Sequence, residues 1–249
     1  MILSPEIFKK YPIVAAQSTR LGGVSESFYT SMNLGMSVND AKENVIKNRE
    51  LFFGALGIEL QQLVISKQVH GNNVYVANAP VITEGYDALI TNKPNVFLAI
   101  SIADCTPVLI YDTKNKAVAG IHAGWKGTVA EIVKHTLQKM KQEYGTNGAD
   151  CKAYIGACIS YDSFEVGEEV AQHFDPAFKK FDEQKQKWFV DLKSVNKKQL
   201  LDFGVLPQNI EISPYCTVKD ERLFFSHRRD KGLSGRMMVV IGLASDKGL

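Results

Sequence analysis

The chain lacks the local cysteine and histidine patterns that mark structural metal sites and disulfide frameworks. Its 249 residues include only four cysteines and five histidines, and neither Cys-x-x-Cys nor His-x-x-x-His occurs. A closed structural zinc site usually contains two such local pairs, and a disulfide scaffold needs a dense set of cysteines. We therefore expect reduced thiols and no structural zinc knuckle.

Long apolar runs and an excess of charge are also lacking. The longest apolar stretch, Val96 to Ala103, is far shorter than a membrane span. The first fourteen residues, interrupted by Pro5 and Pro12, contain no stretch of signal-peptide length. The formal net charge is only +2, and the lysines are spread along predicted helices. These absences predict a cytoplasmic protein that binds neither membranes nor nucleic acid.

What is present is an ordinary globular composition, with 45% hydrophobic and 22% charged residues. Short β-rich runs alternate with helical patterns, and no repeat, low-complexity tract or long linker interrupts residues 1–249. We therefore predict a single domain of the α+β (mixed α/β) class, a sandwich of mixed β-sheets and helices.

The pattern of apolar residues and stop signals assigns the elements. Helices are predicted over about 40–56, 129–144, 167–174 and 191–203, with Asp40 as the first N-cap and Gly145 ending the second helix. Strands are predicted near 63–65, 73–77, 87–91, 96–102, 107–111, 117–121, 153–155, 210–213 and 237–243. The charged segment Asp175 to Trp188 fits neither pattern and is predicted to be a mobile loop.

Three residues that bind zinc well follow apolar β-rich runs: His70, Cys105 and His122. Strand ends in one sheet would bring them together although tens of residues separate them. Two imidazoles and one thiolate form the ligand set of a catalytic zinc, which leaves a fourth position open for water or substrate. Each residue alone is more simply a buried thiol or a hydrogen-bonded imidazole. The trio together predicts a metal site and an enzyme.

Two glycine-containing loops are candidate anion sites. His122 opens His-Ala-Gly-Trp-Lys-Gly-Thr, where backbone amides at a helix start favour anions and Lys126 adds a positive charge. Arg20 lies in a second such loop, and a guanidinium can bind phosphate or carboxylate. Alone, this second loop is only a turn that carries an arginine. The basic turn at His227 is as consistent with solvated charge as with an anion site.

The remaining histidines and cysteines give weaker signals. His135 falls on the polar side of its predicted helix and His173 on a short predicted surface helix, so both are expected to be solvated. Cys151, Cys158 and Cys216 show no partner spacing, so they are expected to be core or incidental residues.

Eight short motifs, taken in order, carry a specific resemblance to a known family. They are Thr-Arg-x-Gly-Gly-Val-Ser (19–25), Asn-Leu-Gly (33–35), Asn-Arg (48–49), Gln-Val-His-Gly (68–71), Asp-Ala-Leu-Ile-Thr (87–91), Ala-Asp-Cys-x-Pro (103–107), His-Ala-Gly-Trp-Lys-Gly (122–127) and Ser-His-Arg-Arg (226–229). Over Ser18 to about Leu243 the chain resembles the YfiH family of laccase-domain proteins, formerly described as polyphenol oxidases. One departure is visible, because the chain has Ile-Gly-Ala-Cys at 155–158 where the family often has Ile-Gly-Pro.

The resemblance implies a mixed α/β fold related to a bacterial toxin deamidase, with zinc bound by His70, Cys105 and His122. It also implies a purine nucleoside phosphorylase. Such an enzyme converts adenosine, inosine or methylthioadenosine and phosphate into the base and ribose 1-phosphate, and adenosine deaminase activity accompanies it. A purine nucleoside and phosphate are then the expected small-molecule partners, and a monomer or weak homodimer is adequate.

Roles can be assigned within that mechanism. Arg20, Lys126 and the amides after His122 would form a phosphate cradle, and zinc would position an oxyanion or polarise a substrate oxygen. Asp104 is the candidate proton shuttle for deamination. Motif membership adds three candidate substrate-binding residues: Asn33, Lys67 and Arg228.

Three alternatives stay open at this point. The first is a copper-dependent polyphenol oxidase, because copper competes with zinc at such ligands, although five histidines are too few for several coppers. The second is a hydrolase that edits cell-wall peptide precursors, with Cys105 as nucleophile and His122 or His70 as base. The third is a non-catalytic binding protein, which no repeat, coiled-coil heptad or exposed apolar stripe supports.

Overall fold

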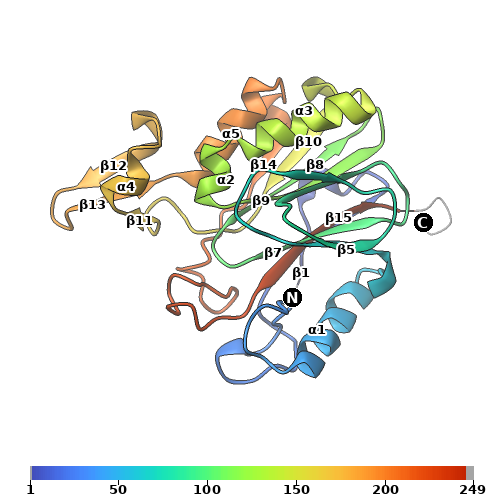
Figure 1. Cartoon of the computed structure of the whole chain (residues 1–249), viewed down its shortest axis with the longest axis horizontal. Coiled ribbons are helices and arrows are strands. Elements are labelled where there is room, and N and C mark those ends of the chain that lie inside the picture. Colours follow the sequence, from blue (N-terminus) through green and yellow to red (C-terminus); the bar gives the residue numbers. More distant parts are fainter. Residues whose placement is uncertain (1, 245–249) are drawn as a thin grey trace.

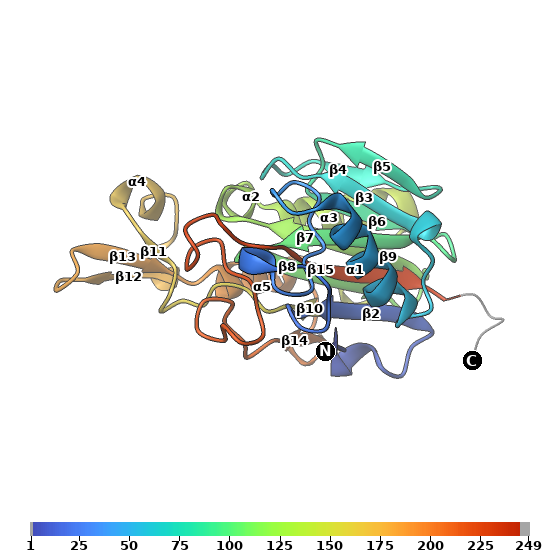
Figure 2. The ribbon, with the colours of Figure 1, turned by 90° about the horizontal axis from the view of Figure 1, so that it is seen from below.

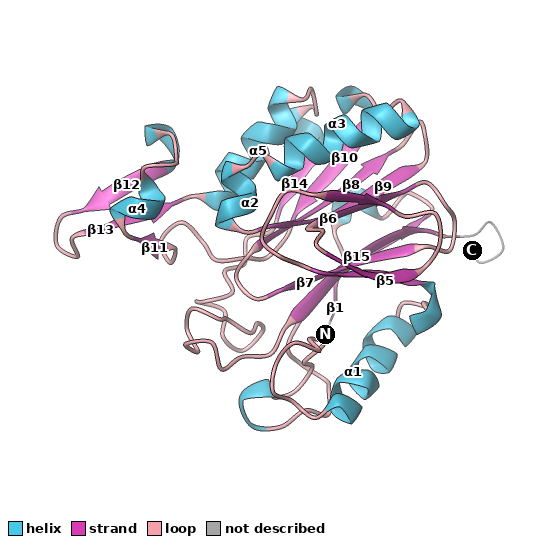
Figure 3. Ribbon diagram, viewed as in Figure 1, coloured by secondary structure: helices cyan, strands magenta, loops and turns pink. Residues whose placement is uncertain are grey.

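Two six-stranded sheets lie face to face between outer layers of helices in the computed structural model, which describes residues 2–244. Helices α3 (Ile132–Tyr144) and α5 (Leu192–Asp202) cover the outer face of one sheet, and α1 (Lys42–Gly54) covers that of the other (Figures 1 and 3). The predicted α+β class with mixed sheets is confirmed.

The two sheets are named A and B here. Sheet A has the order β1 (Ile2–Leu3), β2 (Ile13–Ser18), β15 (Met237–Leu243), β7 (Phe97–Ile102), β3 (Leu63–Lys67) and β5 (Val81–Glu84). Sheet B has the order β14 (Ile210–Ile212), β10 (Cys151–Ile155), β8 (Thr106–Asp112), β9 (Ala117–Ala123), β6 (Ala88–Thr91) and β4 (Val74–Val76). In sheet A, β3 runs parallel to both β5 and β7, whereas the other neighbouring strands of the sheet pair antiparallel. In sheet B the parallel pairs are β4–β6 and β10–β14.

The central strands are buried on both faces because each sheet has a covered outer side. Leu109 and Ile100 point between the sheets into the central core, whereas their neighbours Ile110 and Ala99 point outward. Ile110 packs in the layer under α3 and α5, and Ala99 packs in the layer under α1. Burial on both faces explains why β7, β8, β9 and β15 are nearly continuous apolar runs without alternation.

Residues 164–190 form an arm that projects from one end of the sandwich (Figures 1 and 2). It contains β11 (Glu165–Val166), α4 (Glu168–Ala171), β12 (Lys179–Asp182) and β13 (Lys187–Val190), and its apolar residues share one cluster with Ile159 and Leu192 of the sandwich. The predicted mobile loop at Asp175 to Trp188 is therefore wrong. Its lysines lie on an exposed hairpin, where edge strands tolerate charge, and the rings of Phe181 and Trp188 pack 5.1 Å apart across the pair.

The segment predicted as one helix from Val129 to Tyr144 contains the last residue of one helix and the whole of the next. The first is α2 (Trp125–Val129), and the chain then turns at Glu131, whose φ is +54°, before α3 begins. Gly145, at φ +74°, ends α3 as predicted. The apolar periodicity belongs to α3, and Val129 closes the helix before it.

The other predicted helices differ mainly at their ends. The helix predicted over 167–174 is only the short α4, and the helix predicted to start at Asp40 begins at Lys42 with Ala41 as its N-cap. The Asp40 carboxylate instead accepts hydrogen bonds from Ser25 and Asn33. The helix predicted over 191–203 is confirmed, because the Asp191 side chain caps α5.

Strands β1, β2, β5, β11, β12 and β13 were not predicted. Among residues 2–244, no helix has the length and apolarity needed to cross a membrane.

The layered core predicts that truncating a buried apolar side chain lowers the free energy of unfolding far more than truncating an exposed one. Leu109 is fully buried between the sheets, so Leu109→Ala should lower the free energy of unfolding by about 2–5 kcal/mol through lost transfer energy and a residual cavity. Ile82 is 81% exposed, so Ile82→Ala should change it by about 0.5 kcal/mol or less. Urea titration followed by circular dichroism measures both values. Similar losses in the two variants would contradict the central core described here.

Candidate metal centre

The three predicted metal ligands lie together where strands of both sheets end. His70 follows β3 of sheet A, Cys105 lies between β7 of sheet A and β8 of sheet B, and His122 lies near the end of β9. Because β3 runs parallel to β7, and Thr106 pairs with Ala123 across β8 and β9, these ends meet. The predicted meeting of strand ends is confirmed, with two sheets contributing where one was expected.

The ligand set is compact and open on one side. One ligand atom from each of His70, Cys105 and His122 lies within 4.8 Å of the others. The two imidazole rings are 4.8 Å apart at an interplanar angle of 78°. His122 is buried, Cys105 is partly buried and His70 is exposed. Three protein ligands with an exposed side match the arrangement of a catalytic metal site.

Asp87 fixes both histidines, although the sequence did not single it out as a site residue. Its Oδ1 lies 2.8 Å from His122 Nδ1 and accepts a bond from the His70 amide at 2.9 Å. Its Oδ2 accepts bonds from the amides of Val69 and Gly71. With Nδ1 bound to a carboxylate, His122 presents Nε2 to a metal, as in many carboxylate–histidine–metal arrangements.

The carboxylate of Asp87 is therefore held in its charged form. Burial alone raises the pKa of Asp87, but the hydrogen bonds from His122, Gly71 and Val69 outweigh burial and lower it. The same bonds support the left-handed backbone of His70, whose φ is +61°. A single buried side chain thus orients one ligand ring and anchors the loop of the other.

Gly124 forms the floor of the centre. A Cβ added there would lie 3.1 Å from His70 Cδ2, 3.2 Å from Cys105 Sγ and 3.8 Å from His122 Cε1. A side chain at this position would crowd His70 and Cys105 and would contact His122. The glycine-rich turn after β9 therefore serves close packing beneath the metal site.

Without a metal, the ligands form a charged pair. Burial raises the pKa of the Cys105 thiol, but His122 and His70 outweigh burial and lower it to about 6. Burial lowers the pKa of His122, but Cys105 and Asp87 outweigh burial and raise it to about 9. Because a metal ligand must be deprotonated, binding of a cation would displace the proton of His122 and leave the thiolate in place.

Asp104 precedes a ligand and is engaged in hydrogen bonds. Its φ is +84°, its Oδ1 accepts a bond from the Thr217 hydroxyl at 2.6 Å, and its Oδ2 accepts one from the Arg228 amide at 2.7 Å. Its carbonyl oxygen accepts a bond from the Ile159 amide. Asp104 thus ties three other segments to the Cys105 loop, and its assignment as a proton shuttle stays a prediction.

The candidate substrate-binding residues are placed in different environments. Lys67 and Lys126 are exposed, and the Lys126 ammonium lies 5.7 Å from the Trp125 ring centre. Asn33 is fully buried, where its amide donates to Asp40 and accepts from the Gly35 amide. These positions do not show whether Lys67, Lys126 or Asn33 contacts a substrate, so their predicted roles stay predictions.

Arg20 lines a separate cleft of about 420 Å³. Its Nε and Nη1 donate to the carbonyl oxygens of Thr30 and Glu221, and its guanidinium lies 4.6 Å from the Phe225 ring centre. The predicted phosphate-binding arginine is therefore tied to backbone.

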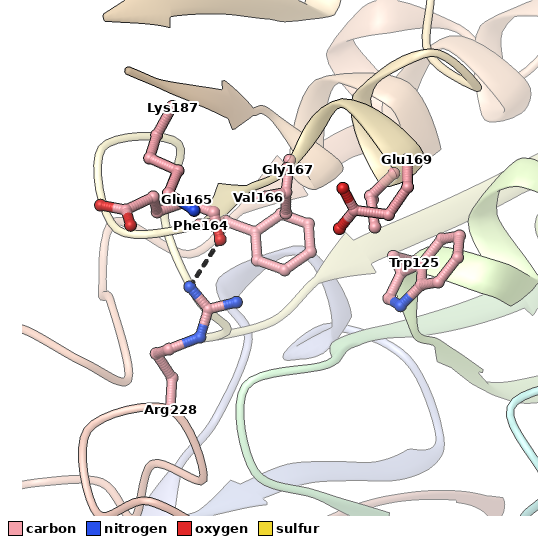
Figure 4. Close-up of a pocket in the computed structure, with 9 residues that line it drawn as sticks. Trp125, Phe164, Glu165, Val166, Gly167, Glu169, Lys187 and Arg228 are labelled. Carbon is pink, nitrogen blue, oxygen red and sulfur yellow. Dashed lines mark hydrogen bonds between the residues drawn. The ribbon is translucent and has the colours of Figure 1, made fainter. Parts of the chain in front are cut away.

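A second pocket, of about 270 Å³, lies where the arm meets Trp125 and Arg228 (Figure 4). It is lined by Trp125, Phe164, Glu165, Val166, Gly167, Glu169, Val170, Lys187 and Arg228. Trp125 directly follows Gly124, and Arg228 is bonded to Asp104 through its amide, so both link the pocket to the ligands. Figure 4 shows the Glu169 carboxylate between the rings of Trp125 and Phe164, and Arg228 donating to the Glu165 carbonyl.

The other histidines and cysteines lie outside the centre. His135, His173 and His227 are exposed, as predicted for the first two; His135 contacts Asn72, and His173 stacks on Trp125. The remaining cysteines are buried and unpaired, which confirms them as core residues: Cys151, Cys158 and Cys216.

A family model, several named relatives and solved structures all match nearly the whole chain. Residues 14–244 match the family described as "Multi-copper polyphenol oxidoreductase laccase". A Bacteroides thetaiotaomicron protein named purine nucleoside phosphorylase is 40% identical, covering 90% of this chain and 89% of its own. The Escherichia coli protein named purine nucleoside phosphorylase YfiH is 33% identical, covering 93% and 94%. The crystal structure of a Bacillus licheniformis protein, YfiH, superposes with a TM-score of 0.91 at 32% identity, covering 97% and 96%.

Replacing Asp87 should weaken metal binding. Asp87→Asn keeps the size of the side chain but removes the charge that orients His122, so zinc affinity should fall by about 10- to 100-fold. Competition with a chromophoric chelator measures the affinity. Asp112→Asn is a matched control, because Asp112 is also buried and hydrogen-bonded but lies at the other end of β8. Equal zinc affinities in wild type and Asp87→Asn would show that Asp87 does not orient His122 for metal binding.

The pKa of Cys105 predicts unusual thiol reactivity in the metal-free protein. A pKa of about 6 gives roughly ten thiolates for each thiol at pH 7, so alkylation by iodoacetamide should rise with pH through a midpoint near 6. Mass spectrometry of the labelled peptide follows the rate, and Cys105→Ser should lose the fast phase. Zinc should protect the thiol. A midpoint near the usual value of about 8.5 would contradict the pairing with His122.

Proposed function

The chain belongs to the family described as multi-copper polyphenol oxidoreductase laccase, as its resemblance to the YfiH proteins predicts, and we propose that it is a zinc-dependent purine nucleoside phosphorylase. The observation that carries the proposal is the open His70–Cys105–His122 centre together with an aromatic-lined pocket. Relatives named purine nucleoside phosphorylase that match at least 90% of this chain support the same substrates, a purine nucleoside and phosphate.

The donor set favours a single zinc ion. Two imidazoles and a thiolate suit zinc, and the exposed His70 side leaves room for a substrate or water ligand. Copper also binds such ligands, but a multi-copper oxidase needs several sites. Within residues 2–244, no other group of three or more His, Cys, Asp or Glu side chains brings its ligand atoms this close together. The geometry therefore supports a one-metal enzyme over a multi-copper oxidase.

The aromatic-lined pocket suits a purine base. Its lining includes the aromatic rings of Trp125 and Phe164, and stacking of a base on an aromatic ring contributes about 1–3 kcal/mol. The Glu169 carboxylate lies between the two rings in Figure 4, where it can accept a hydrogen bond from a base edge. With the base on Trp125, the ribose would extend past Gly124 towards the metal ligands.

Phosphorolysis joins a phosphate oxygen to ribose C1′ as the bond from C1′ to the purine nitrogen breaks. The departing base keeps the electron pair and takes up a proton. When bound, zinc would act as a Lewis acid that orients substrate oxygens and activates water, so adenosine deamination is a second activity open to the site. The chain's own residues would hold base and phosphate in line and keep water from replacing phosphate.

One rival function has a specific observation in its favour. The lowered pKa of Cys105 and its pairing with His122 also suit a thiolate nucleophile beside an acid–base histidine. A hydrolase of this kind would act on an amide, such as a cell-wall peptide precursor. It would be inhibited by zinc, whereas the phosphorylase would require it.

Product analysis by chromatography tests the proposal. Zinc-loaded protein should release adenine from adenosine and hypoxanthine from inosine only when phosphate is present. His70→Ala and Cys105→Ala should lower this release by about 100-fold or more, because the metal contributes several kcal/mol of transition-state stabilisation. His135→Ala, an exposed histidine outside the centre, should retain activity.

The control reactions separate the alternatives. Release of base without phosphate would indicate a nucleoside hydrolase, and inosine formed from adenosine would add the deaminase. If protein with one zinc per chain forms none of these products, the purine assignment is wrong and the amide hydrolase becomes the leading function.

A further inference from the structure

Arg236 is a cation at the same end of sheet A as the metal ligands. It immediately precedes β15, whose first residue, Met237, pairs with Ile102 at the end of β7. This is the last pair of the two strands, so Arg236 and Ala103 are the residues that directly follow it, and Ala103 lies two residues before Cys105. Sequence patterns did not single out this arginine, because its proximity to the centre depends on the pairing of distant strands.

The guanidinium of Arg236 is held in place by backbone. Nη1 donates to the carbonyl oxygens of Ser234 at 2.6 Å and Gly235 at 3.0 Å. The Arg236 amide donates to Asn33 Oδ1 at 2.8 Å, and the side-chain stem lies over Gly35, where an added Cβ would be 2.6 Å from Arg236 Cγ. Asn33 and Gly35 thus position the arginine, and a preorganised side chain loses less entropy on binding a ligand.

This partly buried charge has no carboxylate of its own. No ion pair among residues 2–244 involves Arg236. Burial lowers the pKa of Arg236, and the negative groups that oppose burial are Asp104, Cys105 and Tyr29. The carboxylate oxygens of Asp104 already accept hydrogen bonds from the Thr217 hydroxyl and the Arg228 amide. A bound metal would neutralise part of the negative charge of the Cys105 thiolate. An anion beside the centre would therefore complete the local charge balance.

We propose that Arg236 binds the phosphate substrate beside the metal centre, through the Nε and Nη2 edge of its guanidinium. This inference rests on the proposed phosphorylase function. A guanidinium presents two parallel N–H groups that match two phosphate oxygens, and such charge-assisted bonds are the strong ones.

The predicted phosphate-binding cations are less well placed than Arg236. Arg20 spends its Nε and Nη1 on the carbonyl oxygens of Thr30 and Glu221, and it lies in the separate cleft. Lys126 is exposed on α2, with its ammonium over the Trp125 ring. The proposal therefore assigns to Arg236 the role that the sequence suggested for Arg20.

Calorimetric titration of zinc-loaded protein with inorganic phosphate tests this role directly. Arg236→Gln should weaken phosphate binding on the order of 10- to 100-fold, since bonds to a charged group are lost. Arg236→Lys, which keeps the charge without the fork, should fall between Arg236→Gln and wild type. Lys141→Gln removes an exposed positive charge on α3, away from both arginines, and should leave the phosphate affinity unchanged.

Steady-state kinetics with inosine separates binding from a structural role. In Arg236→Gln the KM for phosphate should rise by a similar factor, while the KM for inosine stays within about 3-fold. A purely structural arginine would lower the melting temperature and shift both KM values together. If Arg236→Gln does not fold, the lysine variant gives the same comparison.

The outcomes distinguish this proposal from the proposed function. If wild type binds phosphate but forms no ribose 1-phosphate, the phosphorylase assignment fails, and calorimetry alone decides the role of Arg236. Equal phosphate affinities in folded wild type and Arg236→Gln would overturn the proposal. Loss of phosphate binding in Arg20→Gln with retention in Arg236→Gln would overturn it in favour of Arg20.

Discussion

The buried carboxylate of Asp87 is the contact on which the metal centre depends. It accepts hydrogen bonds from three consecutive amides of the loop that carries His70 and from the ring of His122. Those two ligands come from different sheets, so one side chain couples the end of sheet A to the end of sheet B. The distances among the ligand atoms therefore follow from how the sheets are stacked and not from any local motif.

The ligands and the overall class could be predicted because both depend on short-range patterns. Apolar strands followed by His70, Cys105 and His122 are visible in the sequence, and parallel or hairpin pairing brings their ends together. Glycine and capping signals likewise placed α5 and the end of α3. The resemblance to a known family added the substrates, which no pattern of spacing could have supplied.

What could not be predicted depends on long-range pairing or unusual backbone. Asp87 has the pattern of an ordinary residue before a strand, and its role appears only when β6 pairs with β9. The break at Glu131 requires a left-handed backbone that a non-glycine residue rarely adopts. Asp104 was interpreted chemically because it adjoins a ligand, whereas the fold gives both of its oxygens hydrogen-bond donors. The hairpin of β12 and β13 was missed because its exposed strands carry charge in place of apolar alternation.

The arm has a consequence for how such an enzyme can diversify. Seven of the nine residues that line the aromatic pocket belong to residues 164–190, whereas every metal ligand belongs to the sandwich. One apolar cluster joins the arm to the sandwich, and Trp125 packs against it from the sandwich side. Under the proposed function, selection of the ligand and the reactive chemistry are therefore encoded in separate stretches of chain. Substitutions, insertions or exchanges in the arm would then change the substrate and leave the residues of the metal centre as they are.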